Sequence, residues 1–600
     1  MFCTRCGGQN NDTARFCIHC GAPLEIPGVA ASPQDNQAEP PRSTARAGRG
    51  LRRWLIAFGA LALVLLCLCG AATAGAYFWL GLHRTDQTAE IVPADTPLFI
   101  SFSPSPRQAR YFRDVESLEA MVPVFGAMPE LRETAEKAQS DLLTQFDIDW
   151  QQDILPWIGG EIGLALIDIE TNDDISPMIL TVATRNEKKS DAFLQKVRRA
   201  MEQEGSKFET ETYRDIPVMY VVPDYEGAFA PAFATFEHLI VVGTNRKALH
   251  RAIDIAQNKD APVLADQEVY QAVLNELPDD RLGYIYLDGP TFLNYTSEEA
   301  DISVDLKALR GAGVSFGLAR DGVRFDYVVS YNPDLMTPEQ RAAQSRPVHR
   351  LKTANLTPAA TIAYWSTQDL PTSWKAFMST MQGASDIEDL VQAFENETGV
   401  HLIDDILAQM TGEVTLVILP DRNGLFGDEE TPLGLLLLAQ TDDPVALKAS
   451  LDDLADYLVD EIEAELDQQE IGDTTFTMLE ESWSGLSLGY GFVDDVLVLG
   501  TSAETLQEVA QTRDESLAAT KTFQAALDPL PNKSSSYLFL NVPKAIRLAS
   551  KMMDEDERAE FNRDLRPYLD PIQALSLGTE AMDRNGMMRG TLYLYTKGRP

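Results

Sequence analysis

Apolar and polar positions follow a regular order in the long C-terminal part of the chain. A short, mostly apolar run from Leu98 to Phe102 predicts a strand, and apolar residues spaced three and four apart from Phe193 to Met201 predict an amphipathic helix. The pattern predicts further strands at 161–167, 178–184, 216–222 and 238–242, and a further helix at 248–256. Because successive strands are joined by tight turns, we expect an α+β fold with mostly antiparallel sheets and helices packed on one face of the sheets.

The same order of segments occurs twice. The segment ILPWIGGEI is matched 252 residues later by ILAQMTGEV, and YQAVLNELPDDRLGYIYLD is matched 253 residues later by FQAALDPLPNKSSSYLFLN. Matched blocks also stand near the beginnings and the ends of both halves. We therefore predict a duplicated ectodomain, with repeat 1 at residues 83–345 and repeat 2 at residues 346–600, each long enough to bury its own core.

Residues 54–82 contain no Asp, Glu, Lys or Arg. A helix of this length exceeds the roughly 30 Å hydrocarbon core of a bilayer, so we predict one transmembrane helix in contact with lipid. A cleaved signal peptide is the alternative, but the apolar run is about twice as long as the apolar core of a signal. This length favours a retained anchor.

The charges on either side of this span predict its orientation. Arginines are frequent between Arg42 and Arg53, before the span, and carboxylates follow it. The positive-inside rule then places the N-terminus in the cytoplasm and the C-terminal ectodomain outside the cell membrane. Residues 25–53 are rich in Pro, Ala, Gly, Ser and Arg, so we expect a flexible linker there.

Four cysteines lie within the first twenty residues as two C-x2-C pairs, Cys3 with Cys6 and Cys17 with Cys20. This spacing suits a structural tetrahedral Zn²⁺ site in a domain of residues 1–24, and metal binding would supply the folding energy of so short a segment. Two disulfides are the alternative. The segment MFCTRCGGQNNDTARFCIHCGAPL resembles the short zinc-ribbon modules at the N-terminus of many bacterial membrane proteins, which implies structural zinc and no catalysis.

The remainder of the chain carries a second resemblance. The opening VPADTPL and the segment GGEIGL are similar to those of a bacterial family built on a domain of unknown function, number 3352. The resemblance covers roughly residues 90–600. It implies a fold and a topology for the ectodomain, and it implies no activity, ligand or catalytic residue.

The charge balance and the motifs narrow the function classes. The chain has 50 Lys and Arg against 91 Asp and Glu, a net charge of −41, which disfavours nucleic acid as a partner of the ectodomain. Two G-x-S-x-G matches, around Ser315 and Ser487, fall inside alternating strand patterns, whereas a nucleophile elbow needs a strand, a turn and a helix. No P-loop, dinucleotide or zinc-protease motif is present.

Carboxylates are the remaining candidates for chemistry. Glu161 and Glu413 occupy matched G-E-[IV] positions in the two halves. A structural carboxylate at a strand edge is one interpretation of this pair, and a repeated contact with a ligand or cation is the other. Neither interpretation names a catalytic pair, and we predict that the protein is not an enzyme.

These observations predict a single-pass, membrane-anchored envelope protein that serves as a non-enzymatic binding or scaffolding module. The cytosolic zinc ribbon is structural. The expected partner of the whole protein is an unidentified protein. Two alternatives stay open. One is a carboxylate-dependent envelope hydrolase, and the other is a membrane-tethered ribbon that binds nucleic acid with the help of the linker arginines.

Overall fold

The structure is a computed structural model of the chain. It describes residues 86–108, 148–169, 176–203, 205–223, 229–296, 306–319, 321–346, 351–380, 384–422, 432–462, 464–481, 487–510, 512 and 515–596. The predicted zinc ribbon, linker and transmembrane helix at residues 1–82 lie outside this part of the chain. None of the helices in the described ranges has the length and apolar composition needed to cross a membrane.

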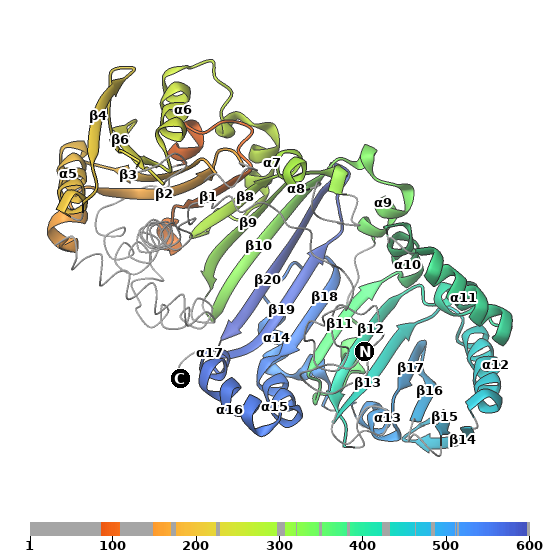
Figure 1. Cartoon of the computed structure of the whole chain (residues 1–600). Coiled ribbons are helices and arrows are strands. Elements are labelled where there is room, and N and C mark those ends of the chain that lie inside the picture. The colour runs from red at the N-terminus through yellow and green to blue at the C-terminus, as the bar shows by residue number, and fades with distance from the viewer. Residues whose placement is uncertain are drawn as a thin grey trace, which may run out of the picture. The chain divides into compact units, whose positions relative to one another are not determined.

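In the described part of the chain, twenty strands form one sheet, and every pairing between them is antiparallel, as the sequence pattern predicts. Hydrogen-bonded neighbours run in the order β4-β5-β6-β7-β3-β2-β1-β8-β9-β10, then β20-β19-β18-β11-β12-β13-β17-β16-β15-β14 (Figure 1). We call the strands β1–β10 with their helices lobe 1, and β11–β20 with theirs lobe 2.

The strands of lobe 1 are β1 (Leu98–Phe102), β2 (Ile158–Leu166), β3 (Met178–Thr184), β4 (Phe208–Tyr213), β5 (Ile216–Val221), β6 (Ala232–Phe236), β7 (Leu239–Gly243), β8 (Gly283–Asp288), β9 (Leu309–Ala319) and β10 (Gly322–Tyr331). Those of lobe 2 are β11 (Ala363–Gln368), β12 (Glu413–Pro420), β13 (Leu433–Gln440), β14 (Ala464–Ile471), β15 (Thr474–Glu481), β16 (Ser487–Val493), β17 (Val496–Gly500), β18 (Ser534–Asn541), β19 (Ile572–Glu580) and β20 (Met587–Thr596).

The order of strands reads the same from either end of the sheet, with each strand of lobe 1 matched by the strand numbered ten higher in lobe 2. The registers carry the same offsets as the sequence repeats: Glu161 on β2 corresponds to Glu413 on β12, and Gly283 on β8 corresponds to Ser536 on β18. The lobes meet where β10 pairs with β20 from Gly322↔Tyr595 to Ser330↔Met587. The pairing of these two strands joins the lobes into a single sheet.

Helices cover both faces of the sheet in each lobe, so the prediction of helices on one face is wrong. Central strands such as β7 are buried on both faces, and both faces therefore need a cover. In lobe 1, one apolar cluster packs α6 and α7 against β1, β7 and β8, and a second packs α5 against the opposite face. The cluster of lobe 2 that contains Leu506 and Phe523 corresponds to the first of these, and the cluster around Leu447 corresponds to the second. The helices are α5 (Glu187–Gln203), α6 (Arg246–Gln257), α7 (Glu268–Glu276), α8 (Gly289–Thr296), α9 (Pro338–Gln344), α10 (Leu370–Thr380), α11 (Ala384–Thr398), α12 (Pro444–Ile462), α13 (Ala503–Ala510), α14 (Lys521–Leu527), α15 (Val542–Met552), α16 (Glu555–Asp564) and α17 (Arg566–Leu569).

Helix α6 shows how local sequence sets these elements. The Asn245 side chain accepts a hydrogen bond of 2.8 Å from the backbone N–H of Ala248, which caps the helix at its N-terminus. Ala248, Leu249, Ala252 and Ile253 then fall on one buried face. The opposite face carries charged residues and lies toward the β4–β5 hairpin.

Candidate functional site

The cysteines predicted to bind zinc, Cys3, Cys6, Cys17 and Cys20, lie outside the described residues. Their donor set is four thiols in two C-x2-C pairs. Four thiolates complete a tetrahedral shell and leave no open position for a substrate, so this set fits a structural Zn²⁺ and not a catalytic one.

The matched carboxylates Glu161 and Glu413 are both buried, with 1% and 0% of their surface exposed. In lobe 2, Oε2 of Glu413 accepts hydrogen bonds from the backbone N–H groups of Lys352 and Thr353 at 2.7 and 3.0 Å. Oε1 accepts from the hydroxyls of Thr353, Tyr364 and Ser366 at 2.7, 3.0 and 2.9 Å. The carboxylate therefore caps the 3₁₀ turn Thr353–Asn355 and ties it to the sheet.

In lobe 1, Glu161 caps the matching turn Gln87–Glu90. It accepts from the backbone N–H groups of Gln87 at 2.8 Å and Thr88 at 3.0 Å. Phe99 occupies the position that Tyr364 has in lobe 2. The buried Ser101 hydroxyl, which corresponds to the Ser366 hydroxyl that donates to Glu413, has no hydrogen-bond partner among the described residues. Burial raises the pKa of the Glu161 carboxyl, and its hydrogen bonds from Thr88 and Gln87 only partly oppose that effect.

These contacts support the structural interpretation of the Glu161 and Glu413 pair. Each carboxylate is enclosed by the donors of its own lobe and is closed to solvent. The two G-x-S-x-G serines are likewise in strands: Ser315 lies in the middle of β9 and Ser487 begins β16. Neither serine stands at a turn from a strand into a helix, which is the geometry a nucleophile elbow needs.

One face of the central strands is apolar and only partly covered. Large apolar residues lie directly opposite one another on eight neighbouring strands from both lobes, and none of them is charged. We call this row the apolar strip. It consists of Phe316, Phe325, Leu592, Leu577, Leu538, Trp365, Leu416 and Leu437.

The two ends of the apolar strip are packed, and the residues between them are half-buried or exposed. Phe316 and Phe325 pack against the second cluster of lobe 1, and Leu437 packs against the Leu447 cluster of lobe 2. Trp365 and Leu416 between them are 42% and 39% exposed. A second row runs parallel to it, two residues along each strand, with Leu594, Leu575, Leu540, Ala363, Ile418 and Leu435.

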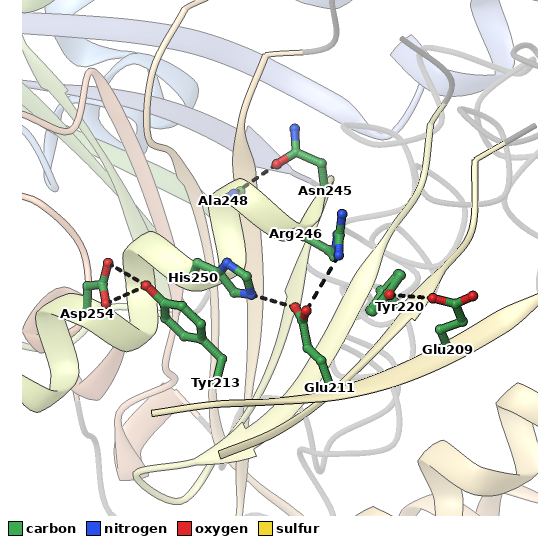
Figure 2. A network of polar contacts seen from close by, with 9 residues as sticks. All are labelled: Glu209, Glu211, Tyr213, Tyr220, Asn245, Arg246, Ala248, His250 and Asp254. Carbon is green, nitrogen blue, oxygen red and sulfur yellow. Dashed lines mark hydrogen bonds and ion pairs between the residues drawn. The ribbon is translucent and has the colours of Figure 1, made fainter. Parts of the chain in front are cut away.

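A polar network joins α6 to the β4–β5 hairpin at the outer edge of lobe 1 (Figure 2). The His250 ring stacks on the Tyr213 ring with centroids 3.8 Å apart and an angle of 5° between the planes. Nε2 of His250 lies 2.8 Å from Oε1 of Glu211, and Nη1 of Arg246 lies 3.5 Å from Oε2 of the same carboxylate. The Tyr213 hydroxyl donates to both oxygens of Asp254, at 3.0 and 3.1 Å.

The network extends along the hairpin in two directions. Arg214 in the hairpin turn pairs with Asp254 at 2.5 Å, and Gln257 donates to the backbone oxygen of Arg214 at 2.7 Å. Toward the sheet, the Arg246 guanidinium lies 4.4 Å from the centre of the Tyr220 ring. The Tyr220 hydroxyl donates to Glu209 at 2.6 Å, which raises the pKa of that tyrosine.

The described residues of lobe 2 do not form this network. Both hairpins close with two residues, so Glu211 and Tyr213 correspond to Gln469 and Ile471, and His250 corresponds to Gln507 on α13. Within the described ranges, no three His, Cys, Asp or Glu side chains are placed to share a metal ion. The network is therefore a set of ion pairs and hydrogen bonds that holds two elements of lobe 1 together.

Local sequence patterns do not predict this network. The sequence does contain one indication of it, the spacing of charged residues on α6. Arg246, His250 and Asp254 are four residues apart and share one face of the helix. Glu209, Glu211 and Tyr213 alternate along β4 and so share one face of that strand. This spacing does not predict that β4 packs against α6.

Comparisons with known proteins agree with both resemblances. The family model described as "Protein of unknown function (DUF3352)" matches residues 59–595, and the zinc-ribbon domain model matches residues 2–24. No curated protein matches the chain.

Among solved structures, crystal forms III, IV and I of TP0453 match with 8%, 8% and 7% identity and TM-scores of 0.24, 0.23 and 0.22. The matches cover 44%, 41% and 42% of this chain and 88%, 81% and 80% of TP0453. Likeness at this level supports no statement about function.

Proposed function

Because the chain belongs to the family of proteins of unknown function DUF3352, we propose its function from its own residues. It is a membrane-anchored, non-enzymatic binding module of the bacterial envelope, with a structural zinc ribbon on the cytosolic side of the membrane. The observation that carries this proposal is the apolar strip. A contiguous, uncharged and partly exposed surface of this kind is typical of an interaction site.

The composition of the apolar strip favours one class of partner. The chain as a whole has a net charge of −41, yet the eight strip residues and the parallel row include no charged side chain. The five strands between the packed ends, from β20 to β12, are spaced by about 4.8 Å and span about 19 Å. An amphipathic helix of about 13 residues has that length, so the proposed partner is a protein that offers an uncharged helix face.

Two features support a non-enzymatic role over the alternative of a carboxylate-dependent hydrolase. Glu161 and Glu413, the matched candidates, hold their own turns through backbone N–H groups and are closed to solvent. A glycosidase needs two carboxyl groups that face a substrate.

The proposal of a membrane anchor is based on the uncharged residues 54–82 and on the arginines that precede them.

The binding proposal is tested by photo-crosslinking in intact cells. A photoreactive phenylalanine analogue replaces Trp365 in the apolar strip, and in a matched construction it replaces Leu335, which is 54% exposed and lies outside the strip. We expect one discrete heterologous protein adduct from position 365 and none from position 335. The adduct at position 365 should disappear when Leu416→Lys is added and persist when Val445→Lys is added.

Any of the following crosslinking results would contradict the proposed partner. An adduct between two copies of the chain would make the strip a homodimer surface, and an adduct only with lipid would make it a membrane contact. Equal adducts from positions 335 and 365 would remove the distinction on which the proposal rests. A separate experiment tests the membrane topology. Protease added to whole cells should digest the ectodomain and leave the zinc ribbon intact.

A further inference from the structure

The β4–β5 hairpin is weakly joined to the rest of the sheet. Strand β5 pairs with β6 at only two register positions, Met219↔Phe233 and Tyr220↔Ala232. The matching hairpin of lobe 2 is joined through four positions between β15 and β16. The end of the lobe 1 hairpin that carries Tyr213 therefore depends for its position on the packing of Tyr213 and Ile216 against the first apolar cluster and on its polar contacts with α6.

Those contacts form a clasp, which we define as Glu211 and Tyr213 of β4 with Arg246, His250 and Asp254 of α6. Side chains make all of its links between strand and helix (Figure 2). His250 has a central place in it, because its ring stacks on Tyr213 and its Nε2 bonds to Glu211. The side chains of His250 and Glu211 are 25% and 31% exposed, so protons can reach the pair from solvent.

The charges around His250 come from both elements. On β4, Glu211 bonds to it directly, and Glu209 is linked to Arg246 through Tyr220. On α6, Arg246 and Asp254 flank it at a spacing of four residues. In the hairpin turn, Arg214 pairs with Asp254. With neutral His250, these three carboxylates outnumber the two guanidinium groups.

Protonation of His250 changes each of its contacts in the same direction. The hydrogen bond to Glu211 becomes a charge-assisted ion pair, which is roughly twice as strong as a neutral one. The stacked imidazolium gains a cation–π attraction to the Tyr213 ring. Repulsion from Arg246 opposes these gains, but Glu211 lies between the two cations and binds both.

From this geometry we propose that the β4–β5 hairpin is a proton-sensitive element of lobe 1, with His250 as its sensor. Acidification tightens the clasp and holds the hairpin against α6, whereas the hairpin opens more often above neutral pH. The relevant interval is about pH 5 to 8, in which an imidazole changes its charge. This device is independent of the binding function proposed for the apolar strip.

Hydrogen exchange of the full-length protein at pH 5.5 and pH 8.0 tests the proposal, with rates corrected for intrinsic exchange. Amides of residues 208–221 should be about fivefold better protected at pH 5.5, the ratio that an ion pair of about 1 kcal/mol produces. The lobe 2 hairpin, residues 464–481, is the internal control. It carries Gln469 and is matched by Gln507, so its protection should not depend on pH in this interval.

Two variants separate the sensor from general effects of pH. His250→Gln keeps a donor toward Glu211 without a titrating ring, and Glu211→Gln removes the carboxylate that an imidazolium would pair with. In His250→Gln the protection ratio of residues 208–221 should fall to about one, and in Glu211→Gln it should fall below fivefold, because the imidazolium then keeps its cation–π contact with Tyr213 and loses its ion pair. An unchanged ratio in His250→Gln would overturn the proposal, as would an equal ratio in the hairpin of lobe 2.

Discussion

Asp326 and Thr591 occupy equivalent positions in the two lobes and lie opposite each other where the lobes join. Strands β10 and β20 are each ten residues long, and β20 begins 265 residues after β10. Asp326 and Thr591, which pair in the sheet, are also 265 residues apart in sequence. The Thr591 hydroxyl donates to Oδ1 of Asp326 at 2.7 Å, and both side chains are buried. A local twofold axis therefore passes through this pair, although the two residues differ.

Thr591→Val should weaken the seam between the lobes. The substitution keeps the shape of the side chain and removes the donor to Asp326, which keeps only its contact with Arg324. We expect a loss of about 1–3 kcal/mol in the free energy of unfolding, measured by urea titration, because a buried acceptor loses a partner. Thr210→Val, on an exposed face of β4, is the control and should change the free energy little. Equal effects of both changes would contradict the role given to this hydrogen bond.

Gly590→Ala should disturb a second link between the lobes. Tyr327 of β10 lies across Gly590 of β20, and its hydroxyl hydrogen-bonds the Thr579 hydroxyl of β19 at 2.6 Å. A Cβ at position 590 would overlap the Tyr327 ring. The expected cost is about 1–3 kcal/mol of unfolding free energy, from overpacking and the lost hydrogen bond.

Two controls identify the cause of that loss. Gly317→Ala should be nearly neutral, because its Cβ would have no neighbour closer than 3.4 Å. In a double-mutant cycle, Tyr327→Ala should make Gly590→Ala less damaging, since the overlapping ring is gone. Strict additivity of the two changes would show that the ring is not the obstacle.

Glu161 should give lobe 1 a specific pH dependence. Burial raises the pKa of this carboxyl in the folded state, so the folded protein binds its proton more tightly than the unfolded chain does. The contribution of Glu161 to stability therefore decreases as the pH rises from the unfolded value of about 4.3 to the raised folded value, and is lowest above it. As the pH rises through this window, the unfolding free energy of Glu161→Gln should increase relative to that of the unmodified protein.

The comparison of variants isolates Glu161 from the many other carboxylates. Glu465→Gln on β14 removes an exposed carboxylate and should give a difference that does not change over the same pH window. Urea titrations at several pH values between about 4 and 7 measure both differences. A constant difference for Glu161→Gln would mean that its proton affinity is the same in the folded and unfolded states.

The zinc ribbon should hold one metal ion per chain through its four cysteines. Cys3→Ser combined with Cys17→Ser should remove bound zinc from the purified full-length protein, because each C-x2-C pair then loses one thiolate. The chain offers its own control in Cys67 and Cys69, which lie in the predicted membrane span. Their replacement by serine should leave the zinc content, measured by elemental analysis, unchanged.

Some strands were predictable from local pattern and others were not. Leu98–Phe102 and Met178–Thr184 agree with β1 and β3 residue for residue, because central strands of this sheet are apolar and their ends are marked by polar residues. Local pattern did not predict β4, whose sequence FETETY has no buried residue, or β6, a short run of small and aromatic residues. Among the described strands β4 pairs with β5 alone, so this pairing defines it more than burial does.

The sequence by itself determined the class of the fold, its internal repetition and the positions of most central strands, because apolar periodicity and repeated segments are local properties of the chain. The offsets of 252 and 253 residues between the halves reappear as register offsets in the sheet. Only the tertiary structure decided that β10 and β20 join the lobes, that Glu161 and Glu413 cap distant turns, and that His250 meets Glu211. Each of these contacts connects residues far apart in sequence, and packing of the whole chain selects such contacts from many that local pattern allows equally.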